Sequence, residues 1–393
     1  MSGVLDSSAS RFAVYFDERH RALASRLERS LERARLEGDP LAVARAMGEA
    51  GGLDLYRLLV PERHGGAEAG RPDDARHVDV RSLVVARELL GGLSAAADSI
   101  FAVQGLGSYP VSAFGSEAQR ARILPGVLAG TRIGAFGLTE PEAGSDVASL
   151  RTRATRDGAG WVLDGHKTLI SNVGIADHVI VFATVDPALG RKGITAFLVD
   201  TAAPGVEASP LFPSSPHPLG ELRFSGCRLR EEDRVGEVGE GFRIAMETLD
   251  AFRISVGAAA SGMARRALAL SLARTQGRVQ FGKPLAEQPV VQSMLAEMAT
   301  ELDAGRLLVA RAAHGRDTTP GGRVTTEAAM AKLYATEAAQ RIVDRAVQLH
   351  GGSGVLVGSE VEALYRDVRP LRIYEGTSEI QRIVIARGLL REA

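Results

Sequence analysis

The sequence predicts a mainly helical protein with a β domain in its middle. Three observations support this fold class: helix-type sequence up to about residue 130, strand-type sequence from about 131 to 235, and helix-type sequence again to the end. The chain has 393 residues, of which 45% are apolar, so it can form two or three compact regions around buried cores. We therefore expect domains at residues 1–130, 131–235 and 236–393.

The first segment is rich in residues that favour helices. Residues 17–38 carry a charged face and end at Gly38, and the high Ala and Leu content continues through residues 80–103. The N-terminal residues MSGVLDSSASRF contain no basic stretch followed by an apolar one. We therefore expect no export signal or transit peptide here.

The middle segment changes to the period of strands. Four short runs are rich in β-branched and aromatic residues and are separated by Gly, Pro and Asp: 161–171, 177–186, 193–200 and 219–229. Short strands that follow one another with turn residues between them are typical of antiparallel sheets. We therefore expect an antiparallel sheet domain.

The last segment returns to helical periodicity after Phe242. Apolar positions recur with a period of about 3.6 at residues 331, 334, 335, 338, 342, 346 and 349, and Gly351 is placed to end that helix. The most apolar long run, residues 254–273, is interrupted by Arg265 and Arg266. It predicts a buried helix rather than a membrane span.

Several function classes are disfavoured by composition and motif. The 47 basic and 48 acidic residues leave a net charge of −1, which favours neither nucleic acid nor an anionic membrane. The single cysteine, Cys227, excludes an internal disulfide framework and a cysteine-rich metal site, and it fits a reducing cytoplasm. Residues 277–284 partly match a phosphate-binding loop, but Pro284 replaces the required Ser or Thr and no strand precedes. We predict no metal site.

Glu375, in the stretch RIYEGTSEIQR (372–382), is the first candidate for chemistry. It stands between Tyr374 and Gly376, just before an expected helix start. An ordinary surface turn would explain it, since charged residues are usually exposed. Alternatively, Gly376 bends the backbone so that Glu375 points into a pocket, where loss of water raises its pKa toward that of a general base.

Three separated stretches resemble the acyl-CoA dehydrogenase family. They are AFGLTEPEAGSD (135–146), GRVQFGKPLAEQPVVQSMLAEMA (277–299) and the segment 348–390, which contains QLHGG and YEGT. The resemblance implies an N-terminal helical domain, a central β domain and a C-terminal four-helix bundle. It also implies FAD bound without a dinucleotide motif, and a homotetramer in which a neighbouring subunit contributes to each FAD site.

The reaction implied by this resemblance is α,β-dehydrogenation of an acyl thioester of CoA or of a carrier protein. Glu375 matches the family's base, which removes the α-proton while a hydride leaves the β-carbon for flavin N5. A second lineage places its base at the position of Phe252, which cannot take a proton. An electron-transfer flavoprotein would accept the electrons. The rivals are an acyl-CoA oxidase or a flavin monooxygenase on the same fold, and a scaffold without activity.

The resemblance also assigns binding residues. Arg278 supplies the guanidinium that a dianionic pyrophosphate needs in a nearly neutral protein. The full set of implied FAD contacts is Phe136, Leu138, Thr139, Gly144, Ser145, Leu169, Ser171, Arg278, Gln280, Phe281, Gln288, Gln348, Gly351, Gly352, Thr377 and Glu379. The implied substrate contacts are Ser145, Asp250, Arg253 and Gly376. Leu169 departs from the family pattern, which often has Trp or Phe there.

Two finer expectations concern the surroundings of Glu375. Ser378 and Gln381 have the spacing of a capping box, so we expect Ser378 to cap the last helix. No Lys or Arg occurs between Arg87 and Arg120, an interval that helps to form the acyl pocket in the family. An uncharged wall disfavours dicarboxylic substrates, whose distal carboxylate needs a cation.

Overall fold

The computed structural model describes residues 6–69, 74, 76–319 and 324–392. The chain forms two compact units. The bundle unit comprises the residues up to Arg33, Val80–Asp98 and those from Arg253 onward, and the sheet unit comprises Ala34–Asp79 and Ser99–Phe252. Two helices belong partly to each unit, α5 (Ala95–Phe114) and α7 (Gly241–Gly277).

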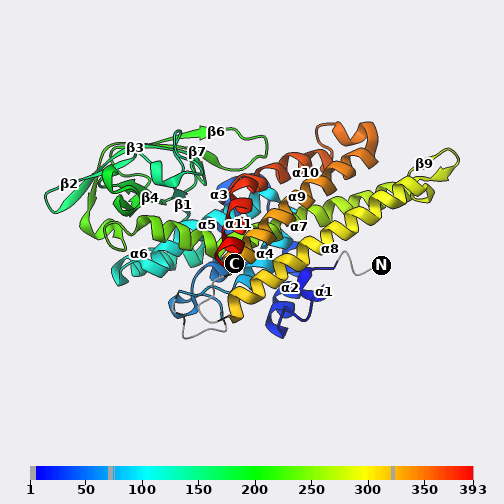
Figure 1. Ribbon diagram of the computed structural model, residues 1–393, viewed down its shortest axis with the longest axis horizontal. Coiled ribbons are helices and arrows are strands. Elements are labelled where there is room, and N and C mark those ends of the chain that lie inside the picture. Colours follow the sequence, from blue (N-terminus) through cyan, green and yellow to red (C-terminus); the bar gives the residue numbers. More distant parts are fainter. Residues whose placement is uncertain (1–5, 70–73, 75, 320–323, 393) are drawn as a thin grey trace. The chain divides into compact units, whose positions relative to one another are not determined.

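The bundle unit is built from long helices of the C-terminal segment. They are the end of α7, α8 (Pro289–Thr318), α9 (Thr325–His350), α10 (Glu360–Val368) and α11 (Ser378–Glu392), joined by the N-terminal helices α1 (Ser8–Arg11), α2 (Glu18–Leu31) and α4 (Val80–Leu93). Helices α7, α8 and α9 run side by side (Figure 1), and their apolar faces share one core with α10. The apolar positions predicted for α9 are buried, except for half-buried Tyr334, and Ile342, Ala346 and Leu349 lie in this core.

Helix α2 begins where the sequence predicts and ends early. Asp17 and His20 cap its start with reciprocal hydrogen bonds. The helix stops at Leu31, so the prediction that it continues to Gly38 is wrong. The chain passes to the sheet unit at Ala34, where Leu36 is buried. Packing of an apolar face stabilises helices in proteins more than propensity does, which explains the early end.

The sheet unit contains an eight-stranded sheet with the helices α3 (Pro40–Ala46) and α6 (Glu117–Ala129) and the remainder of α5 and α7. Its strands are β1 (Gly134–Gly137), β2 (Arg153–Asp157), β3 (Gly160–Ser171), β4 (His178–Thr184), β5 (Ile194–Asp200), β6 (Val206–Leu211), β7 (Leu219–Arg230) and β8 (Arg234–Val235). The order is β6-β7-β3-β2-β4-β5-β8, with β1 beside β4. The four predicted strands correspond to β3, β4, β5 and β7.

The sheet is mixed rather than purely antiparallel, which corrects the prediction. β1 pairs with β4 in parallel from Gly134↔His178 to Gly137↔Val181, and Arg153 of β2 pairs in parallel with Thr184. Parallel neighbours need a long crossover connection. The chain supplies one here, because the segment after β1 and the β2–β3 hairpin separate β1 from β4 in sequence.

Strands β4 and β5 are buried on both faces. On one face, Ile180 and Phe182 pack in a core with residues of α6 and α7, and on the other face Val179 and Val181 pack with Trp161 and with residues of β7. A continuous apolar run is the pattern expected for a strand covered on both sides. No helix in the part of the chain that the structure describes is long and apolar enough to cross a bilayer.

Candidate active site

Glu375 lies in a tight turn in the bundle unit, between a short 3-10 helix at Arg369–Arg372 and helix α11. Both turn residues have left-handed backbones, with φ of 51° at Glu375 and 92° at Gly376. A Cβ at residue 376 would come within 2.6 Å of Gln381 Nε2, so glycine is needed there. A left-handed backbone is strained for a non-glycine residue such as Glu375, and such strain is concentrated at functional sites.

Three buried side chains hold the two carbonyls of this turn. Lys332 Nζ donates to Gly376 O at 2.8 Å, and Gln381 Nε2 donates to the same oxygen at 2.9 Å. Gln381 Nε2 and Arg253 Nε each lie 3.4 Å from Glu375 O. These donors come from α9, α11 and α7, and all three residues are buried. The turn is therefore fixed by three separate helices of the bundle unit.

The Glu375 side chain has an unsatisfied acceptor. The residue as a whole is half-buried, while its Oε2 is fully buried and has no hydrogen-bond partner among the residues that the structure describes. Burial raises the pKa of this carboxyl, and the charges of Arg87, Arg253 and Lys332 oppose that effect. A carboxylate of this kind favours the pocket interpretation over the exposed turn.

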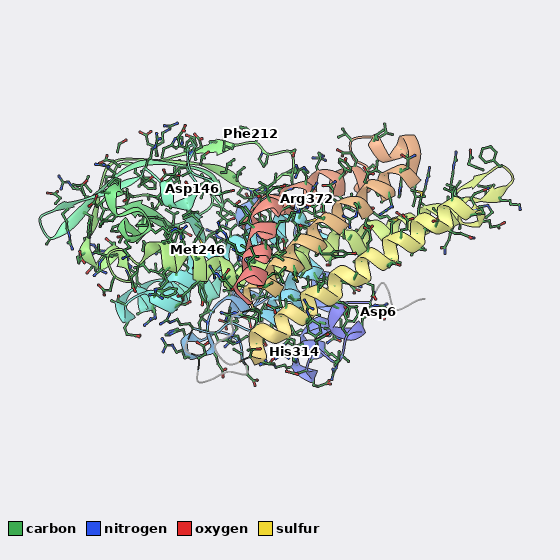
Figure 2. The ribbon with its side chains drawn as sticks, in the orientation of Figure 1. Asp6, Asp146, Phe212, Met246, His314 and Arg372 are labelled. Carbon is green, nitrogen blue, oxygen red and sulfur yellow. The ribbon has the colours of Figure 1, made fainter. Side chains whose placement is uncertain are left out.

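The start of α11 differs from the predicted capping box. Thr377 Oγ1, not the hydroxyl of Ser378, accepts the N–H of Ile380 at 3.3 Å. Ser378 Oγ instead donates to Glu337 at 2.6 Å, and Glu337 also pairs with Arg372, which Figure 2 labels. The left-handed turn moves the cap one residue earlier than the sequence spacing indicates. Thr377 is half-buried and Glu379 is exposed.

The segment with Arg278, Gln280 and Phe281 forms an exposed hairpin. Strands β9 (Val279–Gln280) and β10 (Lys283–Pro284) are joined by a turn at residues 281 and 282, whose φ values of 52° and 78° suit a type I′ hairpin. The hairpin projects beyond the ends of α7 and α8 (Figure 1). Phe281 is 95% exposed, and Gln288 precedes the first residue of α8.

The other predicted adenosine contacts lie at the end of α9. Gln348, Gly351 and Gly352 are exposed there, and Gly351 ends the helix with φ of 61° as the sequence predicts. A Cβ at either glycine would meet nothing within 4 Å. Arg274 Nη2 donates to His350 O at 3.3 Å and so ties the end of α7, from which the hairpin extends, to the end of α9.

In the sheet unit, a buried ion pair fixes the loop that follows β1. Lys167 Nζ lies 2.7 Å from Glu140 Oε1 and 3.2 Å from Leu138 O. Glu140 also accepts the N–H of Thr152, and Thr139 O accepts the N–H of Thr168. Burial lowers the pKa of Lys167 to about 8 despite this partner. The pair was missed in the sequence, although Glu140 lies in the quoted motif 135–146 and Lys167 lies in the predicted strand 161–171.

The predicted FAD contacts in β1 and in the loop that follows it differ in the exposure of their side chains. The ring of Phe136 is packed against Phe182 with centroids 5.0 Å apart, and Leu138 is buried. A ligand could therefore contact the backbones of Phe136 and Leu138 rather than their side chains. Thr139 is half-buried, whereas Gly144 and Ser145 are exposed in the same loop as Asp146, which Figure 2 labels.

Leu169 and Ser171 lie near the end of β3. Leu169 is 60% exposed and has a φ of 55°, an unfavourable combination for an apolar, non-glycine residue. Half-buried Ser171 has its Oγ 3.4 Å from His217 Nε2. No sequence signal pointed to His217. An exposed, strained leucine beside a hydroxyl is consistent with a surface that a ligand covers.

The alternative base position contains no acid. Phe252 is fully buried, lies edge-to-face on Tyr109 with centroids 5.9 Å apart, and would overlap a Cβ placed at Gly105. Asp250, two residues earlier, is half-buried. Arg253, which is 7% exposed, donates to the carbonyl of Glu375 and so helps to hold the turn.

The acyl-pocket interval begins at a charged residue, Arg87. Arg87, at the edge of that interval, is fully buried and acts on the pKa of Glu375. Its guanidinium is paired with Asp98 at 2.8 Å, so the cation is neutralised. The interval itself contains no Lys or Arg, so the expectation of a wall without a free cation stays a prediction.

Comparisons with known proteins identify the family. Three family models match in chain order: acyl-CoA dehydrogenase N-terminal domain over residues 16–131, middle domain over 135–227 and C-terminal domain over 239–390. The chain belongs to the acyl-CoA dehydrogenase family. It is thus an oxidoreductase of a flavin-dependent family, and the predicted family and fold class are confirmed.

Individual relatives agree along nearly the whole chain. The short-chain specific acyl-CoA dehydrogenase of Homo sapiens is 39% identical over 366 residues, covering 91% of this chain and 85% of the relative. The butyryl-CoA dehydrogenase structure of Megasphaera elsdenii has a TM-score of 0.85 and 34% identity, covering 96% of this chain and 99% of that one. A glutaryl-CoA dehydrogenase of Mycobacterium smegmatis in complex with FADH2 has a TM-score of 0.84 and 29% identity, covering 96% of both chains.

The residues present in each unit fit a flavin nucleotide. In the bundle unit, exposed Arg278 offers a cation for phosphates, exposed Phe281 offers an apolar surface, and Gly351 and Gly352 leave open space for close approach. In the sheet unit, exposed Leu169 offers an apolar contact to a ring. The buried Oε2 of Glu375, which has no hydrogen-bond partner among the described residues, is the polar atom that a reacting C–H group could meet.

Proposed function

We propose that the protein catalyses α,β-dehydrogenation of an acyl-CoA with bound FAD and that Glu375 removes the α-proton. The observation that carries this proposal is the buried Oε2 of Glu375, which finds no partner in the described part of the chain and belongs to a turn fixed by Lys332, Gln381 and Arg253. A general base needs a lone pair that is open to the proton and a fixed position. The Oε2 atom supports the first condition, and the donors to the carbonyls of the turn support the second. Membership of the family supports the same reaction.

The chain's own residues supply proton removal and orientation. Glu375 accepts the α-proton, and its raised pKa brings the carboxylate closer to the strength that this weakly acidic proton needs. The backbone N–H of Glu375 is the donor that we assign to the thioester oxygen, which stabilises negative charge developing there. When bound, FAD accepts the β-hydrogen as hydride.

The cofactor contacts follow the two units. In the sheet unit we assign the ring to the backbones of Phe136 and Leu138, to Thr139, Gly144 and Ser145, and to Leu169 and Ser171. In the bundle unit we assign the pyrophosphate and adenosine to the hairpin, the end of α9 and the start of α11, through Arg278, Gln280, Phe281, Gln288, Gln348, Gly351, Gly352, Thr377 and Glu379. Ser145, Asp250, Arg253 and Gly376 complete the substrate side. The exposure of the hairpin supports a contribution to the site of a neighbouring subunit.

The substrate that we propose has an apolar or modestly polar acyl chain. Arg87 donates to both carboxylate oxygens of Asp98, through Nε and Nη2, so its charge is already paired and is not free for a distal carboxylate. The relatives act on short acyl groups in one case and on glutaryl-CoA in another. The paired state of Arg87 favours the first kind.

A panel of thioesters tests this proposal. We expect butyryl-CoA or isovaleryl-CoA to bleach the oxidised flavin band anaerobically and glutaryl-CoA to bleach it more slowly. Glu375→Gln should reduce the rate by about 10²- to 10⁴-fold, the usual contribution of a general base, while FAD stays bound. Preference for glutaryl-CoA would refute the substrate class, and bleaching at the full rate in Glu375→Gln would refute the base.

The electron acceptor and the assembly complete the proposal. We propose an electron-transfer flavoprotein as acceptor, a homotetramer as the assembly, the cytoplasm as location, and residues 1–130, 131–235 and 236–393 as the domains. Fast reoxidation of the reduced flavin by air in stopped flow would instead indicate an acyl-CoA oxidase. Sedimentation velocity of the FAD-loaded protein tests the tetramer.

A further inference from the structure

A buried ion pair lies behind the Glu375 turn. Arg87 of α4 and Asp98 of α5 form a two-pronged contact, with Nε to Oδ1 at 2.9 Å and Nη2 to Oδ2 at 2.8 Å. Arg87 Nη1 also donates to Ser255 Oγ of α7 at 3.1 Å. Arg87 is 0% exposed and Asp98 is 1% exposed. Paired charges buried this deeply are costly to desolvate, so a gain in stability is not a sufficient explanation for the pair.

The Arg87–Asp98 pair is linked to the residue before Glu375 and to the support of the Glu375 carbonyl. Arg87 lies close enough to Tyr374, the residue before Glu375, to act on the pKa of its phenol. Ser255, which binds the other end of the guanidinium, lies two residues after Arg253, whose Nε reaches Glu375 O. The pair therefore acts electrostatically on the neighbour of the base, and through Ser255 it is linked along α7 to Arg253, which supports the carbonyl of the base.

The charged groups around Glu375 come from four helices. Arg87 of α4, Arg253 of α7 and Lys332 of α9 are cations that favour the ionised carboxyl, while Asp98 of α5 opposes them. On the turn itself, Tyr374 is neutral because burial raises the pKa of its phenol. The protonation state of the base thus depends on a balance to which the Arg87–Asp98 pair contributes charges of both signs.

We propose that the Arg87–Asp98 pair is a positioning element for the reaction, which keeps Glu375 ionised at neutral pH without weakening it as a base. The inference rests on the proposed role of Glu375. A lone cation behind the carboxylate would make it a poor proton acceptor, and a wholly apolar site would leave it protonated. A cation that is already paired with its own counter-ion attracts the carboxylate more weakly than a free cation would, and more strongly than an apolar group.

Single substitutions in the two halves of the pair should shift the acid limb of the pH–rate profile in opposite directions. Arg87→Met removes a cation, so the limb moves to higher pH and the rate of flavin reduction falls by about tenfold at neutral pH, with recovery as the pH is raised. Asp98→Asn frees the charge of Arg87, so the limb moves to lower pH and the plateau rate falls. A merely structural pair would lower both rates and leave the limb unmoved, and that result would overturn the proposal.

The fold offers a matched control for this experiment, and a double variant covers the case in which Arg87→Met does not fold. Arg306 of α8 and Glu88 of α4 form another fully buried pair, and Arg306→Met should reduce stability without moving the acid limb. If Arg87→Met fails to fold, the neutral double variant Arg87→Met/Asp98→Leu replaces it. We expect its acid limb to lie closer to that of the wild type than the limb of Asp98→Asn. A double variant whose limb coincides with that of Asp98→Asn would contradict the balance of charges.

A second measurement separates this inference from the proposed function. The carbonyl-stretch band of protonated Glu375, identified by its loss in Glu375→Gln, can be titrated in infrared difference spectra without substrate. Opposite shifts of this titration in the two single variants support the inference even if no thioester reduces the flavin, a result that would refute the proposed function alone. Flavin reduction with an unshifted titration in both variants would refute the inference alone.

Discussion

Lys332 Nζ donates to the backbone carbonyl of Gly376 at 2.8 Å, and its charge acts on the carboxylate of Glu375 in the preceding position. The ammonium group is therefore part of the support of the turn and of its electrostatics. Burial lowers the pKa of Lys332 from 10.5 to about 8, although Glu375 draws it upward. A cation kept in such surroundings has a cost that can be measured.

The first prediction concerns the pH dependence of stability. Since the folded-state pKa of Lys332 is lower than the unfolded one, the unfolded chain binds more protons between pH 8 and 10.5, and the folded state gains stability as the pH rises through this range. The free energy of unfolding of the wild type minus that of Lys332→Met should increase by about 3 kcal/mol across it. Urea titrations at several pH values provide the measurement, and a flat difference would contradict the buried ammonium.

The second prediction concerns the strain at Glu375. Because its φ is 51°, a residue without Cβ is preferred there on backbone grounds. Glu375→Gly should be more stable than Glu375→Ala by about 1 kcal/mol, and neither should reduce the flavin. Comparing two variants that both lack the carboxylate isolates the backbone contribution. Equal stabilities in urea would show that the turn is relaxed.

The third prediction concerns Gly376. A Cβ there would lie 2.6 Å from Gln381 Nε2 on a backbone with φ of 92°. Gly376→Ala should cost about 1–3 kcal/mol of unfolding free energy and displace the donor that holds the turn. Gly277→Ala is the control, since a Cβ at Gly277 meets nothing within 4 Å. Thermal unfolding of both variants, with the flavin reduction rate of Gly376→Ala, tests this; a stable and fully active Gly376→Ala would count against the model of the turn.

The fourth prediction concerns the exposed hairpin. Phe281 is 95% exposed, so Phe281→Ser should leave the unfolding free energy within about 0.5 kcal/mol of the wild type. If the ring covers the adenosine part of FAD, the same change weakens cofactor retention. The ratio of FAD to protein after gel filtration measures this, with Val14→Ser, at a position 80% exposed, as the control. Equal retention in both variants would remove Phe281 from the FAD site.

The order of the elements was predictable because it depends on local periodicity. The strands β3, β4, β5 and β7 were found from runs of β-branched and aromatic residues, and Gly351 was recognised as the end of α9. The predictions that were wrong concerned features that depend on contacts between residues distant in sequence. The parallel pairing of β1 with β4 and the early end of α2 at Leu31 both follow from where the chain next finds a partner.

The candidate base likewise combines a feature that the sequence predicted with features that only the fold shows. The motif around Glu375 identified the residue, but only the fold shows the three donors from separate helices and the oxygen left without a partner. The sequence analysis did not identify Lys332, Asp98 and Arg87 as parts of the site, because each occurs in an ordinary helical segment without a motif. Nothing in their local sequence indicates that they lie around one turn.

The residue types and their spacing alone determined the succession of helical, β and helical segments, the family resemblance and the identity of the acid at position 375, because propensity, periodicity and motif are properties of neighbours in the chain. Tertiary structure alone decided the left-handed turn, the cap at Thr377, and the ring of charges around the carboxylate. Burial and Coulomb interactions depend on distance in space, which residues hundreds of positions apart acquire only when the chain folds.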